Sequence, residues 1–120
     1  MRIAPAMAAA LFGTVLIVAP AAFGDEKARD NILRAEAQIK ALNPADAGAA
    51  SATEYQTAQL RLGEARTAED KNRDVESFWR SEEASVQADI VQEKIKLRGL
   101  ERTVSEIETG IATLRRELNS

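Results

Sequence analysis

The chain has 120 residues and contains neither Cys nor His. These absences exclude disulfides, metal sites built on thiolate or imidazole ligands, and mechanisms that pair a nucleophile with an imidazole base. Its 16 basic and 19 acidic residues give a net charge of −3, which is too balanced for a nucleic-acid-binding surface.

The N-terminal segment, residues 1–24, has the pattern of a secretory signal peptide: a basic start, an apolar run and a tail of small residues. Ala22 and Gly24 occupy the −3 and −1 positions, so we expect cleavage after Gly24, with a second choice after Ala21. The remaining residues, 25–120, are then expected to form one helical domain in the periplasm.

An uncleaved anchor is the alternative interpretation of this segment, because the uncharged run 3–24 is long enough to enter the inner membrane. Pro20 interrupts that run, and the strongly apolar part before it is shorter than the roughly 20 residues that a membrane-spanning helix needs. We therefore favour cleavage, and expect no membrane insertion afterwards.

The first expected helix covers residues 27–42 and has apolar residues at alternating intervals of four and three, which is a heptad pattern. These residues are Ala28, Ile32, Ala35, Ile39 and Leu42. The pair Asn43 and Pro44 ends the helix, since a residue before proline avoids the helical conformation. Small residues then predict a loop over 43–50.

The second expected helix covers residues 52–71. Ser51 and Glu54 form a capping-box pattern at its start, in which the Ser51 hydroxyl is expected to accept a hydrogen bond from the Glu54 amide. One side of this helix carries Tyr55, Ala58, Leu62 and Ala65. A polar turn around residue 73 separates it from the third helix.

The third expected helix is the longest, over residues 74–119, and its large apolar side chains follow one heptad register. We call this set the apolar stripe: Trp79, Val86, Ile90, Leu97, Leu100, Val104, Ile107, Ile111, Leu114 and Leu118. Glu83 and Glu93 occupy the two remaining places in the register. Because a buried unpaired carboxylate is costly, they are expected to mark where the seam opens or where its register is specified.

The expected fold is all-α, an antiparallel helical hairpin or coiled coil whose first arm is broken near Pro44. If the tip lies near residue 73, the first helix pairs with the end of the third, with residue numbers that add to 146. The predicted pairs are Ala28–Leu118, Ile32–Leu114, Ala35–Ile111, Ile39–Ile107 and Leu42–Val104. A three-helix bundle is the alternative, and Phe78, Val91 and Ile95 lie off the stripe where they would serve it.

Two helices with few large apolar residues form a thin core, so we expect self-association or a protein partner. The candidate contacts are Tyr55, Phe78 and Trp79, because aromatic side chains dominate interfaces. Adjacent carboxylates such as Glu82 and Glu83 are interpreted as solvated helix faces. We expect no enzymatic activity, no cofactor, no metal and no nucleic-acid partner.

The order of these elements resembles the family known as domain of unknown function 4398, which comprises exported, Ala-rich helical proteins. The residues that carry the resemblance are Ala35, Ile39, Ala49, Tyr55, Ala58, Leu60, Leu62, Ala65, Asp74, Ala84, Ala88 and Leu114. Members are often lipoproteins or are joined to a peptidoglycan-binding domain, which implies the Gram-negative envelope and a peptidoglycan-associated partner. This chain departs from them in lacking the lipid-acceptor Cys and the appended domain.

The expected function is therefore that of a non-enzymatic, exported helical protein acting as a structural or protein-interaction module in the bacterial cell envelope. The alternative is a periplasmic chaperone-like holdase that clamps unfolded clients between helical arms.

Overall fold

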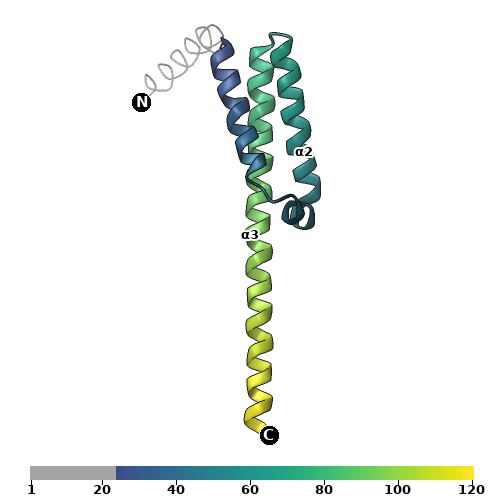
Figure 1. Cartoon of the computed structure of the whole chain (residues 1–120), viewed down its shortest axis with the longest axis vertical. Coiled ribbons are helices and arrows are strands. Elements are labelled where there is room, and N and C mark those ends of the chain that lie inside the picture. The colour runs from purple at the N-terminus through teal and green to yellow at the C-terminus, as the bar shows by residue number, and fades with distance from the viewer. Residues whose placement is uncertain (1–23) are drawn as a thin grey trace, which may run out of the picture.

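The computed structural model describes residues 24–120, and that part of the chain consists of three helices (Figure 1). The N-terminal helix covers residues 24–40, α2 covers Pro44–Asp70 and α3 covers Asp74–Asn119. The all-α prediction is confirmed. The predicted signal peptide, apart from Gly24, lies outside the described residues.

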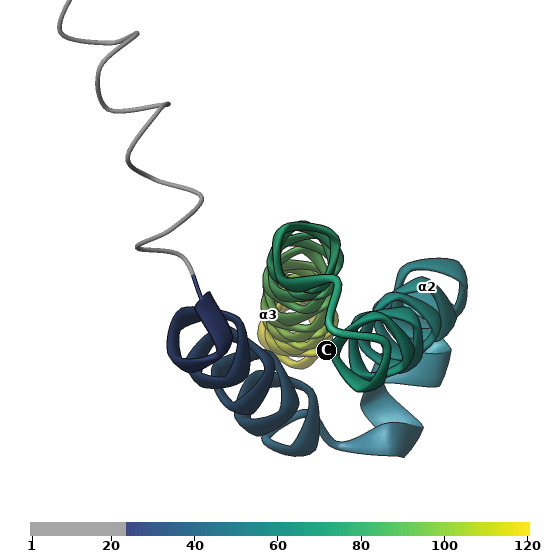
Figure 2. The same cartoon turned by 90° about the horizontal axis from the view of Figure 1, so that it is seen from above.

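The three helices form a bundle at one end of the molecule, and α3 continues beyond it (Figures 1 and 2). Ion pairs join Arg29 to Glu69 and Arg66 to Glu36, so the N-terminal helix runs antiparallel to α2. The amide of Asn31 lies 3.2 Å from the carbonyl oxygen of Phe78. The N-terminal helix therefore lies beside the start of α3, as in the three-helix bundle that was the alternative arrangement.

The antiparallel hairpin is formed by α2 and α3, about the turn expected near residue 73. Glu54 forms an ion pair with Lys94 at 3.2 Å, and the carbonyl oxygen of Ala49 accepts a hydrogen bond from Arg98 at 3.2 Å. Both pairs have residue numbers close to the predicted sum of 146. The sum thus describes α2 against α3, and its use for the N-terminal helix was wrong, because residues 104–118 are exposed.

The tip of this hairpin is a short turn closed by an asparagine in the left-handed region. Asn72 has φ 58°, a conformation that asparagine tolerates better than most residues. The amide of Asn72 donates to the carbonyl of Glu69 at 2.9 Å, and that of Arg73 donates to the carbonyl of Ala68 at 2.8 Å. This pair of hydrogen bonds is a Schellman motif, so Asn72 ends α2 rather than capping α3.

The loop predicted over residues 43–50 is instead a short helical piece that forms the first part of α2. Asn43 caps it, accepting a hydrogen bond from the Asp46 amide at 3.0 Å, and Pro44 occupies the first turn. The helix breaks at Ser51, which has φ −161° and ψ 56°. There the Ser51 hydroxyl donates to the Glu54 carboxylate at 2.6 Å, in place of the predicted bond from the Glu54 amide.

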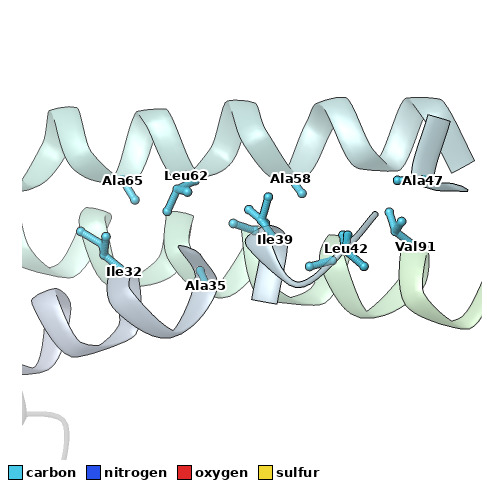
Figure 3. Packing of buried hydrophobic residues seen from close by; sticks show 11 residues of the cluster. Ile32, Ala35, Ile39, Leu42, Ala47, Ala58, Leu62, Ala65 and Val91 are labelled. Atoms are coloured by element: carbon cyan, nitrogen blue, oxygen red, sulfur yellow. The ribbon is translucent and has the colours of Figure 1, made fainter. Parts of the chain in front are cut away.

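The core lies between the three helices and is built largely from alanine (Figure 3). The N-terminal helix contributes the predicted heptad residues up to Ile39, Leu42 follows from the turn after it, and α2 contributes Ala58, Leu62 and Ala65. The side chains of Ile32, Ile39 and Leu62 point into the space between the helices in Figure 3. From α3, the core receives Ala84, Ala88 and Val91, none of which belongs to the apolar stripe.

Candidate interaction surface

The long helix α3 carries two heptad patterns on opposite sides. One is a set of buried residues that we call the small face: Ser77, Ser81, Ala84, Ala88 and Val91. The other is the apolar stripe, whose register is offset from the small face by two residues, or about 200° around a helix. The small face packs against the N-terminal helix and α2, because short side chains let helices approach closely.

The apolar stripe faces away from the bundle along its whole length. Its members are exposed by fractions that run from 36% at Ile90 to 84% at Leu118. A shallow hollow in this surface is lined by Val86, Ile90 and Leu97 with neighbouring charged residues. An extended apolar patch on a protein surface is often a site of interaction with a protein or a membrane.

The last half of α3 projects from the bundle without support from the rest of the described chain. We call residues 74–95 the bundle half and residues 96–119 the projecting half. Every residue of the projecting half is exposed, and its hydrogen bond to α2 is made at Arg98, near its start. At 1.5 Å per residue, the projecting half is about 36 Å long.

The sequence of the projecting half gives the helix little intrinsic stability. Gly99 and Gly110 each cost about 1 kcal/mol relative to alanine. A methyl group built on either glycine would meet nothing within 4 Å, so neither glycine serves a close contact in this chain. Most helical stability in proteins comes from packing an apolar face. The projecting half has that face but, within the described residues, nothing packed on it.

Glu83 and Glu93 lie on the exposed side of α3, as their places in the stripe register require. The Glu83 carboxylate pairs with Arg61 at 3.1 Å and with Arg80 at 3.2 Å. The Glu93 carboxylate pairs with Lys96 at 3.5 Å. Neither carboxylate is buried in this chain, so their predicted role in specifying a register stays a prediction.

The three aromatic residues predicted as contacts do not form one site. Trp79 is exposed at the beginning of the apolar stripe. Phe78 is half-buried and lines a hollow beside the N-terminal helix, although its ring meets that of Trp79 edge-to-face at 5.3 Å. Tyr55 packs against the core from α2. Of the three, the structure places only Trp79 on the apolar stripe.

A polar cluster that sequence reasoning missed fixes the N-terminal helix on α3. Asn31 is only 8% exposed, and its amide nitrogen donates to the Ser81 hydroxyl at 2.7 Å. Its carbonyl accepts a hydrogen bond from Arg34 at 2.8 Å, and Arg34 also pairs with Glu82. The only signal in the sequence was the position of Asn31 beside the heptad residues Ala28 and Ile32.

The contacts at the break in α2 stabilise the ionised form of the Glu54 carboxylate. The hydrogen bond from the Ser51 hydroxyl, helped by the Glu54 backbone amide and by Lys94, lowers the pKa of Glu54 from 4.5 to about 2. Glu54 and Lys94 therefore join the break in α2 to α3 near the end of the bundle half.

Residues 24–120 hold no group of three or more acidic side chains placed to bind a metal ion. In the same part of the chain, no helix combines the length and apolar character that crossing a bilayer requires.

Comparison of the chain with protein families, with curated proteins and with solved structures finds no match. The resemblance to the domain of unknown function 4398 therefore stays a prediction.

Proposed function

We propose that the chain is an exported, non-enzymatic protein-interaction module of the bacterial cell envelope, and that its working surface is the apolar stripe of α3. The three-helix bundle holds the helix, and the projecting half presents the stripe to a partner. The envelope location is supported by the signal-peptide pattern of residues 1–24 and by the resemblance in small-residue spacing.

The observation that carries this proposal is that α3 buries its small side chains and exposes its large apolar ones. Small residues such as Ala84 and Ala88 are fully or almost fully buried, whereas large residues such as Leu100 and Ile107 are exposed. A helix that served only its own fold would place the large side chains inward, since their burial stabilises most. The reverse placement favours a partner on the outer side.

The proposal is tested with a photo-crosslinking amino acid introduced into the full chain in cells. A probe that replaces Leu100 lies on the stripe, and a matched probe at Arg102 lies on the opposite side of the same helix turn. We expect protein adducts from Leu100 and few from Arg102. Equal labelling from both positions, or labelling from neither, would contradict the proposal.

The same cells test the location. Fractionation should place the protein in the periplasm, and N-terminal sequencing should find that the mature chain begins at Asp25. A chain that retains Met1 in the membrane fraction would support the uncleaved anchor instead.

A chaperone-like holdase is the second candidate function, because the exposed apolar stripe also offers a surface for unfolded clients. A holdase should suppress aggregation of a denatured client protein, and replacement of Ile107 by Asp should weaken that suppression. An interaction module with one fixed partner should leave client aggregation unchanged.

A further inference from the structure

We infer that the occupant of the apolar stripe is a second copy of this chain, paired with the first as a parallel, in-register coiled coil through the projecting halves. This inference rests on the proposed function and names the partner at its surface. The heptad positions, the flanking charges and the area that such pairing removes from water support this parallel pair.

The heptad positions of the projecting half suit a two-stranded coiled coil. Leu97, Val104, Ile111 and Leu118 occupy the a positions, and Leu100, Ile107 and Leu114 occupy the d positions. Parallel dimers favour β-branched side chains at a with leucine at d, a pattern that Val104, Ile111, Leu100 and Leu114 follow. No polar residue interrupts the seven places.

The charges beside the stripe favour the parallel arrangement. In a parallel pair, each g position faces the e position five residues later on the other helix. Lys96 then meets Glu101 of the second copy. The next two such pairs are Thr103 with Glu108 and Gly110 with Arg115, so these three pairs bring no like charges together.

The antiparallel arrangement pairs only six of these seven side chains with one another and brings like charges together. It places Leu97 against Leu114 and Val104 against Ile107 of the second copy, leaves Leu118 opposite Glu93, and its flanking contacts join e to e and g to g. Glu101 then faces Glu108 and Lys94 faces Arg115, against one pair of opposite charges, Lys96 with Glu117. Like charges across an interface suppress the wrong pairing, so the flanks select the parallel one.

The stripe offers enough apolar surface for such a contact. A buried aliphatic side chain removes roughly 60–120 Å² from water, so the seven side chains of the projecting half remove roughly 400–800 Å² per copy. Stable interfaces bury about 800 Å² per partner. Val86, Ile90 and Trp79 are exposed on the same side of the bundle half and extend the contact towards that value. Glu93 would meet its own copy at a d position, so the contact is tightest from Leu97 onward and looser beside Val86 and Ile90.

The orientation is tested by disulfide trapping, because the native chain has no cysteine. Purified Leu100→Cys and Ile111→Cys variants, one carrying a mass tag, are mixed and exposed to a mild oxidant. A disulfide needs Cα atoms within about 7 Å, so parallel pairing gives only like-with-like dimers. Antiparallel pairing joins residue 100 to residue 111 and gives only the mixed dimer, which would overturn the inference.

Association itself is measured by sedimentation of the chain and of two matched variants, Ile107→Asp on the stripe and Thr109→Asp on the opposite side. A carboxylate at residue 107 of each copy should raise the dimer Kd by roughly 100-fold or more, and Thr109→Asp should leave it nearly unchanged. Circular dichroism of the chain and both variants, recorded at a concentration where all three are monomeric, controls for misfolding of the bundle.

A native chain that remains monomeric at every concentration would overturn the inference. The proposed function is judged separately. If the Leu100 probe in cells then labels a different protein, the interaction surface stands with another occupant. If it labels nothing, both proposals fail.

Discussion

The two halves of α3 differ in which side of the helix has a partner. In the bundle half, small residues such as Ser81 and Ala84 pack against two other helices, and the larger Val86 and Ile90 face outward. In the projecting half, the side that continues the small face becomes polar, with Arg102, Ser105 and Thr109, while the apolar stripe continues unchanged. The stripe is therefore independent of the bundle.

This comparison shows that one helix meets two separate requirements along the same sequence. The small face ends where the bundle ends, as a surface for folding should. The apolar stripe spans both halves, as a surface for binding along the whole helix should. Matched changes in the two halves, or in the contacts that define the bundle, measure this difference.

The largest expected effect comes from overpacking the small face. Ala84 is fully buried, and Ala84→Leu should lower the free energy of unfolding by about 2–3 kcal/mol, because the helices cannot approach as closely. Ala112 occupies the same heptad position four heptads later but is exposed. Ala112→Leu should change stability by less than about 0.5 kcal/mol. Denaturant unfolding at one fixed protein concentration measures both free energies. Equal losses of stability in the two variants would contradict the proposed difference between the halves.

A smaller loss is expected from the polar cluster of the bundle half. Asn31→Ala removes the donor to the Ser81 hydroxyl and to the Phe78 carbonyl, and should cost about 1–2 kcal/mol. Gln92→Ala removes an exposed amide from α3 and serves as the control. Thermal unfolding separates the two variants. Indistinguishable midpoints would show that Asn31 does not hold the N-terminal helix in place.

The turn between α2 and α3 tests the hairpin itself. Asn72→Val forces a β-branched residue into the left-handed region and should cost about 1 kcal/mol or somewhat more. Asn72→Gly should be close to neutral, since glycine adopts that conformation freely. If chemical denaturation shows the same stability for both variants, the Schellman turn does not limit the hairpin.

The smallest expected effect is the pH dependence due to Glu54. Its pKa falls from 4.5 to about 2 on folding, so its ionised form stabilises the folded chain above pH 4.5. That contribution should disappear as the pH falls from 4.5 towards 2. In Glu54→Gln, the melting temperature should be lower at neutral pH and should fall less steeply over this range. Parallel acid profiles for the two proteins would argue against the Ser51–Glu54 contact.

Local patterns predicted the elements of the fold well. Pro44 and the polar turn near residue 73 mark the ends of the helices in the sequence, and the expected third helix matches α3. The antiparallel pairing around that turn also follows from sequence, because helices joined by a short connection usually pack side by side.

The orientation of α3 could not be predicted in this way. Large apolar residues at heptad spacing are the stronger signal, so the pattern predicts that the stripe pairs with the chain's own N-terminal helix. Burial of Ser81 and Ala88 depends on how closely three helices approach, which is a property of the assembled bundle. The contact between Asn31 and Ser81 joins residues that are distant in the sequence, so no local pattern predicts it. Aromatic type alone does not say which side of a helix is exposed, and of the three predicted contacts only Trp79, the one on the stripe, is exposed, among large side chains that face away from the bundle.

Hydrogen exchange along α3 tests whether the projecting half pairs with a second copy through the apolar stripe while the bundle folds independently. In the native chain at high concentration, amides of residues 100–118 should be protected, and either dilution or Ile107→Asp should abolish that protection. Amides of the bundle half should exchange at the same rate throughout. Fast exchange of the projecting half under every condition, or loss of protection in both halves together, would contradict the account.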